Sequence, residues 1–84
     1  MIPRKLIDLY KAKIPRKITE LQFFIDQSDL ENLRFAVHKL QGSSGTYGYM
    51  KVSQECALWE FELKNGSLEQ SREHLENIRR FFHE

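Results

Sequence analysis

The sequence has little of several features that mark an exported or membrane-embedded chain. It contains one cysteine, Cys56, so an internal disulfide is excluded, and a single thiol fits a reducing compartment. No run of about 18 apolar residues is present to span a bilayer, and the N-terminus lacks the basic-then-apolar layout of a secretory signal. We therefore expect a soluble cytoplasmic domain without membrane insertion.

The chain is also short, and no charge of one sign dominates it. Its 84 residues, 40% of them apolar, allow one modest core, so we expect a single domain over residues 1–84. Such a core is too small to hold a nucleotide cofactor and a substrate site together. The formal net charge of +1 does not point to nucleic acid.

The first 17 residues are more basic than the rest of the chain. Around Asp8 they contain Arg4, Lys5, Lys11, Lys13, Arg16 and Lys17. The favoured interpretation is a solvated helix face, and the alternative is contact with phosphate or with an acidic partner.

Apolar residues recur at three- and four-residue steps, with little strand-like alternation. The pattern runs over residues 6–25, 30–47, 49–63 and 68–82. Four amphipathic segments with short connections predict an all-α fold, an antiparallel up-down four-helix bundle. Pro15 should either kink the first segment or begin a second short helix within it.

Two capping boxes are predicted to mark helix starts. In SDLE, Ser28 should cap the backbone of Glu31, and in SLEQ, Ser67 should pair with Gln70 in the same way. Gly66 suits the left-handed position that follows a helix.

Three of the four glycines lie in the segment HKLQGSSGTYGY, residues 38–49. The segment lacks the Lys of a Walker-type phosphate loop and the spacing of a dinucleotide-binding fingerprint. A flexible linker is also excluded, because the apolar stripe that begins at Leu30 continues through Leu40 to Tyr47. The helix should therefore run to about Tyr47 and end at Gly48.

Helical geometry places His38 on the solvent side, about 130° from the centre of the apolar stripe. Gly42 and Gly45 follow on the same face, and each glycine inside a helix costs about 1 kcal/mol relative to alanine. Because no packing gain inside the bundle is expected from them, we interpret both as clearance for a partner surface beside His38. Phe35, one turn earlier, is either a docking contact or a partly buried residue at the edge of the core.

An exposed imidazole is mostly neutral near pH 7, and its ring nitrogen can attack phosphorus to form a phosphoramidate. Lys39 and Gln41 offer polar groups for phosphoryl oxygens, although Lys39 points about 100° away from His38. The three histidines have no metal-ligand spacing among themselves, and no metal site is expected. Cys56 lies on an apolar stripe, as expected for a buried structural thiol.

The pattern H-x-L-x-G-S-S-x-x-x-G, which starts at His38, is similar to the signature of the histidine phosphotransfer (HPt) domain family. The likeness continues through Cys56, Glu60 and the Asn65-Gly66 turn, and it covers most of the chain. The resemblance implies a helical bundle whose exposed histidine carries a phosphoryl group between aspartates. Those aspartates belong to receiver domains of response regulators and of hybrid sensor histidine kinases.

The resemblance also assigns roles by position. His38 is the expected phosphoacceptor of a carrier that has no ATP site and no kinase activity of its own. The residues expected around the phosphoryl group are Lys39, Gln41, Gly42 and Glu60. Independently of the resemblance, the residues expected to contact the partner are Arg34, Phe35 and Gly45. Glu60 either contacts His38 or is a solvated surface residue.

One position departs from the family pattern. The family usually has Lys three residues after the histidine, and this chain has Gln41. The missing cation should affect the transfer rate and the lifetime of the phosphohistidine. We expect no cofactor bound by this chain, magnesium supplied by the receiver domain, and a monomer.

Two other function classes are compatible with a small helical bundle. One is a non-catalytic scaffold that docks receiver domains. The other is a helical nucleic-acid binder that uses the basic N-terminal segment, for which binding should depend steeply on salt.

Overall fold

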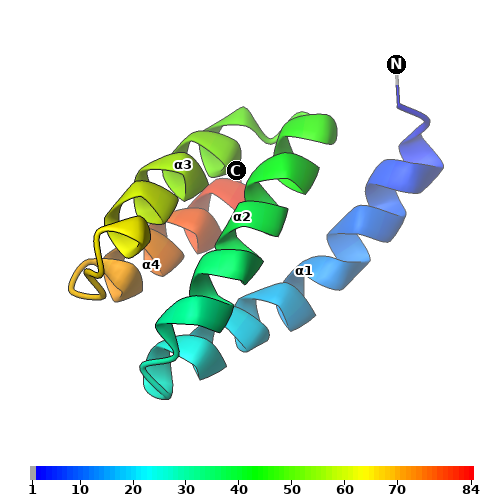
Figure 1. Ribbon diagram of the computed structural model, residues 1–84. Coiled ribbons are helices and arrows are strands. Elements are labelled where there is room, and N and C mark those ends of the chain that lie inside the picture. The colour runs from blue at the N-terminus through cyan, green and yellow to red at the C-terminus, as the bar shows by residue number, and fades with distance from the viewer. Residues whose placement is uncertain (1) are drawn as a thin grey trace.

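A computed structural model describes residues 2–84 as four helices, with no strand in that range. The helices are α1 (Arg4–Asp26), α2 (Leu30–Thr46), α3 (Met50–Lys64) and α4 (Ser71–Phe82). Each helix packs against two others, in the pairs α1–α2, α2–α3, α3–α4 and α1–α4 (Figure 1). The predicted all-α four-helix bundle is confirmed.

The core lies where the helical spacing placed it. Each helix presents one apolar stripe to the centre of the bundle, and Trp59, Leu33, Val37, Cys56 and Ile78 have no exposed surface. The core residues of α1 repeat at three- and four-residue steps, as an amphipathic helix requires. They are Tyr10, Ile14, Ile18, Leu21 and Ile25.

Helix α1 is one continuous helix, so Pro15 neither ends it nor starts a new one. Pro15 is exposed, and the hydroxyl of Thr19 donates to its carbonyl oxygen at 3.0 Å.

The N-terminal turns of α1 extend beyond the end of α2. Tyr10 stacks on Tyr47, just after the end of α2, at a ring-centroid distance of 4.3 Å. The turn before Tyr10 therefore extends past α2, and Leu6 on that turn is exposed although it continues the apolar pattern.

The predicted cap at Ser28 is wrong. Ser28 has a positive φ of 52° and terminates α1. Its backbone N–H donates to the carbonyl oxygen of Ile25, and the backbone N–H of Asp29 donates to the carbonyl oxygen of Phe24. These two bonds form the left-handed motif that ends many helices. Asp29 is the N-cap of α2 in place of Ser28, and its carboxylate accepts from the backbone N–H of Asn32 at 3.2 Å.

The predicted cap at Ser67 is also wrong, because α4 begins only at Ser71. Gly66 is left-handed as predicted, with φ of 80°. In this turn the backbone N–H of Ser67 donates to the carbonyl oxygen of Glu62, so Ser67 is part of the motif that terminates α3 and does not start α4. Ser71 is buried, and its hydroxyl oxygen accepts from the indole N–H of Trp59 at 2.9 Å.

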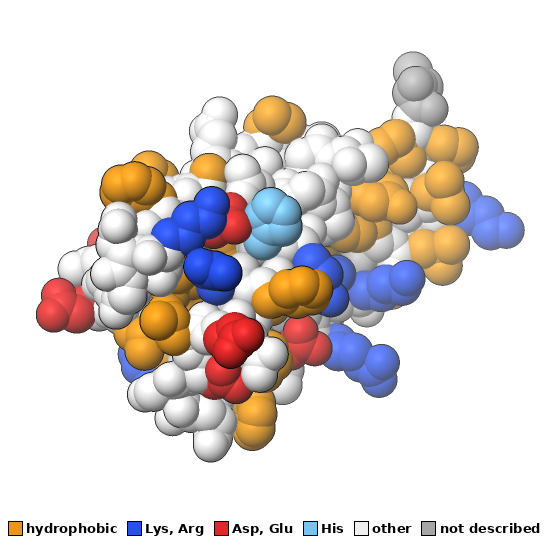
Figure 2. Space-filling model, in the orientation of Figure 1, with side chains coloured by type: hydrophobic (Ala, Val, Ile, Leu, Met, Phe, Trp, Pro, Cys, Tyr) orange, Lys and Arg blue, Asp and Glu red, His pale blue; other side chains and the backbone are white. Residues whose placement is uncertain are grey.

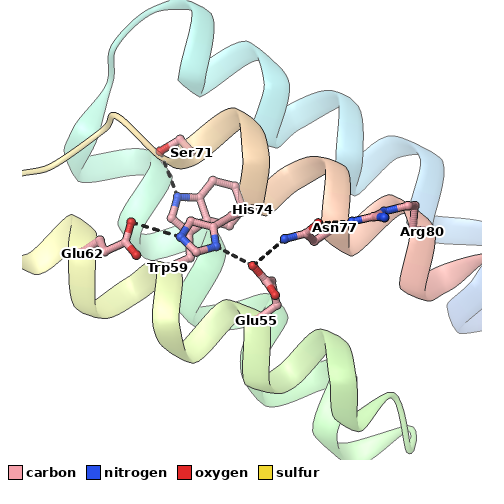
Figure 3. Close-up of polar contacts among 7 residues, drawn as sticks. All are labelled: Glu55, Trp59, Glu62, Ser71, His74, Asn77 and Arg80. Carbon is pink, nitrogen blue, oxygen red and sulfur yellow. Dashed lines mark hydrogen bonds and ion pairs between the residues drawn. The ribbon is translucent and has the colours of Figure 1, made fainter.

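A buried polar cluster fixes α3 against α4 (Figure 3). His74 on α4 stacks on Trp59, and its side chain is 10% exposed. Its Nδ1 lies 2.6 Å from a carboxylate oxygen of Glu55, and its Nε2 lies 3.1 Å from one of Glu62, both on α3. Asn77 donates to the same oxygen of Glu55 at 3.1 Å. The cluster sets the position of α3, the helix that also carries Glu60.

Candidate functional site

His38 stands on the outer face of α2, as the helical geometry predicted. The buried positions of α2, among them Val37 and Leu40, face the core, while 70% of the His38 side chain is exposed. Figure 2 shows a histidine side chain (pale blue) on the surface, with charged and hydrophobic side chains around it.

Glu60 on α3 holds one nitrogen of this ring. A carboxylate oxygen of Glu60 lies 2.8 Å from Nδ1 of His38, and the Glu60 side chain is only 13% exposed. Of the two alternatives for Glu60, contact with His38 is the one observed. The carboxylate can only accept, so the contact assigns a proton to Nδ1 and leaves the Nε2 lone pair free in the neutral ring. Within residues 2–84, Nε2 of His38 has no hydrogen-bond partner.

The two glycines beyond His38 have different surroundings. A Cβ built at Gly42 would meet nothing within 4 Å, so this position is open, as predicted. A Cβ at Gly45 would lie 3.3 Å from the hydroxyl oxygen of Ser53 on α3. Gly45 therefore lies close to α3, whereas Gly42 faces open space.

An open hollow of about 440 Å³ lies beside His38, toward the C-terminal end of α2. Its lining residues are His38, Gln41, Gly42, Gly45, Thr46, Ser53 and Glu60. The half-buried Gln41 accepts two hydrogen bonds on its backbone carbonyl, from Ser44 at 3.2 Å and from Ser53 at 3.1 Å. Sequence reasoning missed Thr46 and Ser53, whose polar side chains lie in or beside the helix contact without a motif to mark them.

A second hollow lies on the other side of His38. Its lining residues are Glu31, Asn32, Arg34, Phe35, His38, Glu60 and Lys64. Phe35 is 64% exposed, so of its two predicted roles the partly buried edge residue is excluded. Arg34 and Phe35 thus share one surface with His38, and Lys64 joins them from α3 without having been predicted.

Lys39 is turned away from these two hollows. Its Nζ lies 5.1 Å from the ring centroid of Phe35, a cation–π geometry. Beyond Phe35 it lines a separate hollow between α1 and α2. The direction of the Lys39 side chain agrees with the helical geometry, which predicted that Lys39 points about 100° away from His38.

The serines of the glycine segment and Cys56 are structural. Ser44 is fully buried, and the Ser43 and Tyr10 hydroxyl oxygens lie 2.9 Å apart in a hydrogen bond. Burial, with Glu55 and Glu60 nearby, raises the pKa of the Cys56 thiol to about 12. A thiol with that pKa stays protonated near neutral pH and is a poor nucleophile. The prediction of a buried structural Cys56 is confirmed.

Comparison with known proteins adds a family. A family model described as Hpt domain matches residues 5–84, essentially the whole chain. No curated protein and no solved structure matched the chain in the corresponding searches. None of the helices in the described part of the chain combines the length and the apolar content that crossing a bilayer requires.

Proposed function

The chain belongs to the Hpt domain family, and from that premise we propose that His38 accepts a phosphoryl group on Nε2 and passes it on. Hpt domains carry phosphoryl groups on histidine in two-component phosphorelays, without kinase activity of their own, and interact with receiver and kinase domains. More specifically, we propose that this chain relays the phosphoryl group between the aspartates of two receiver domains, one of them in a hybrid sensor histidine kinase. The alternative, a docking scaffold without transfer, is an outcome of the test below.

The observation that carries the proposal is the contact between His38 and Glu60. Glu60 accepts at Nδ1, so Nε2 presents its lone pair outward, on a side chain that is 70% exposed. The Nε2 lone pair attacks the phosphorus of an aspartyl phosphate. The N–P bond forms as the bond from phosphorus to the acyl oxygen breaks, and the aspartate leaves as a carboxylate. The ring becomes positively charged in this step, and the Glu60 carboxylate stabilises that charge through Nδ1–H.

The surrounding residues leave room for a partner and supply few charges. Gly42 has open space where a Cβ would stand, so the phosphoryl group and the partner can approach the ring from that side. Gln41 lines the hollow, and its side-chain amide is a group that can donate a hydrogen bond to a phosphoryl oxygen. Phosphoryl transfer rests mainly on positioning and charge neutralisation. We propose that the partner supplies the rest of the charge, including a magnesium ion held by the receiver domain.

The test is a transfer reaction. The protein is incubated with a phosphorylated receiver domain and Mg²⁺, and the chain is examined for label that is labile in acid and stable in base. We expect label on the wild type and on His83→Gln, an exposed histidine used as the control, and none on His38→Gln. Label that persists in His38→Gln contradicts the proposal. A wild type that binds the receiver and takes no label supports the scaffold instead.

A further inference from the structure

A concentration of positive charge lies between α1 and α2, on the flank of the proposed transfer site. The hollow there has a volume of about 250 Å³. Its lining residues are Lys13, Arg16, Lys17, Glu20, Leu21, Ala36, Lys39 and Leu40. Four cations and one carboxylate give this hollow a formal charge of +3, which exceeds the net charge of +1 of the whole chain.

The charge is not neutralised inside the molecule. Among residues 2–84 the ion pairs involve Lys51, Arg72, His38 and His74, and none of the four cations of the hollow. Like charges that share a small surface repel one another and destabilise the compact state. A surface of this kind gains most from a partner of opposite charge, which removes the repulsion on docking.

This surface is continuous with the one that contains His38. Lys39 lines the basic hollow and also lies over the ring of Phe35, which lines a hollow together with His38. In Figure 2, Lys and Arg side chains (blue) over α1 and α2 lie on the same face as a histidine and as exposed hydrophobic side chains. A partner seated on Phe35 and His38 therefore also covers Lys39 and faces the cations of α1.

We propose that Lys13, Arg16, Lys17 and Lys39, here called the basic flank, select receiver domains that carry Asp and Glu side chains on the docking surface around the pocket of their phosphoacceptor aspartate, outside the magnesium site itself. The proposal rests on the proposed function, because the partner is seated by its approach to His38. A receiver is favoured over nucleic acid because the flank joins an aromatic contact and the transfer site. Charges at the rim of an interface act mainly on the association rate and on its salt dependence.

The experiment measures association with phosphorylated receiver domains from the source organism by stopped-flow fluorescence. The receivers are grouped by whether the surface beside the aspartate is acidic or basic. The test variant carries Lys13→Glu, Arg16→Glu and Lys17→Glu, so the side chains next to His38 are untouched. The control carries Arg4→Glu, Lys5→Glu and Arg79→Glu, which changes the net charge equally at exposed positions outside the flank.

We expect the flank variant to associate with acidic receivers about tenfold or more slowly at low salt, since electrostatic steering accelerates association by about 10- to 1,000-fold. The difference should shrink near 0.5 M salt, where charges are screened over about 4 Å, and the control should stay close to wild type. An equal loss in both variants, or a flank variant as fast as wild type, overturns the proposal. So does an unchanged association with receivers together with lost binding to a DNA duplex of about 20 base pairs, which would assign the flank to nucleic acid.

Failure of the proposed function gives a different result. Phosphoramidate is a small phosphodonor that needs no docking surface, and we expect it to label His38 of the wild type. Without label from either phosphoramidate or any receiver, the proposed function fails. With label on His38 but no effect of the flank charges, only the present inference fails.

Discussion

Helix α3 offers glutamates to two histidines, and the two sites differ in what they leave open. His38, from α2, has one nitrogen bound to Glu60 and a side chain that is 70% exposed. His74, from α4, has both nitrogens bound, to Glu55 and Glu62, and a side chain that is 10% exposed. Its ring also stacks on Trp59, so it has neither a free lone pair nor access for a partner.

The difference shows that a neighbouring carboxylate does not by itself make a histidine reactive. At His38 the carboxylate fixes the proton on Nδ1 and leaves Nε2 free, whereas at His74 two carboxylates occupy the whole ring. Both nitrogens of His74 can donate to them only when both carry a proton. With both ring nitrogens in contact with carboxylates of α3, His74 holds α4 on α3 in place of reacting.

The largest effect is expected from removing the closed site. His74→Ala leaves two partly buried glutamates without their common partner, and loss of one member of a buried pair costs about 3 kcal/mol or more. Urea denaturation should show a free energy of unfolding lower by that amount. His83→Ala, at an exposed position, is the matched control and should unfold like the wild type. Equal stability of the two variants would show that the His74 cluster does not hold α3 and α4 together.

The open site can be closed by filling the space beside it. In Gly42→Leu, transfer from a phosphorylated receiver should fall about 100-fold, because misplacement of reacting groups by about 1 Å costs that much. The fold should survive, since a Cβ at position 42 meets nothing within 4 Å and loss of a helical glycine adds up to about 1 kcal/mol of stability. Gly42→Ala is the control for size and should keep most of the activity. Unfolding of the leucine variant would mean that the glycine serves internal packing.

Removing the single carboxylate of the open site should have a moderate effect. Glu60→Ala takes away the acceptor at Nδ1, so the ring loses its fixed tautomer and the stabilisation of its developing positive charge. A hydrogen bond to a charged group contributes about 1.5 kcal/mol or more, which corresponds to about a tenfold slower transfer in a single-turnover assay. Glu31→Ala provides the comparison, because Glu31 lines the neighbouring hollow without a contact to His38. Equal rates in these two variants would remove Glu60 from the mechanism.

The smallest effect concerns the departure from the family pattern. Gln41→Lys places a cation on the hollow beside His38, where it can pair with a phosphoryl oxygen. Exposed ion pairs contribute about 0.2–1 kcal/mol, so the phosphohistidine half-life should lengthen by no more than about fivefold. Gln41→Met, of similar length and without charge, separates the effect of the cation from that of shape. A shorter half-life in Gln41→Lys than in Gln41→Met would contradict this assignment.

The exposed position of His38 could be predicted from the sequence because it depends on one helix. A regular period of 3.6 residues fixes which residues share a face, and it placed His38 outward and Leu40 inward correctly. The contact of Glu60 with His38 was one of two predicted alternatives. It could be considered at all because a short turn at Gly48 makes α2 and α3 antiparallel, which brings the two residues together.

The closed site could not be predicted, because it depends on the pairing of two helices. His74 and its partners Glu55 and Glu62 are 19 and 12 residues apart, so no local period links them. The same limit explains Gly45, whose neighbour Ser53 lies on the facing helix. The misplaced cap has a local cause: Ser28 adopts the left-handed conformation that more often falls to glycine, and this shifted the start of α2 by one residue.

The central claim is that Nε2 of His38 carries the phosphoryl group while Nδ1 stays with Glu60. NMR spectroscopy of the protein with ¹⁵N-labelled histidine, phosphorylated by its receiver domain, tests this most directly. We predict a phosphorus–nitrogen coupling at Nε2 of His38 alone, with the proton retained at Nδ1 and the resonances of His74 unchanged. A coupling at Nδ1 of His38, or at either nitrogen of His74 or His83, would contradict the account.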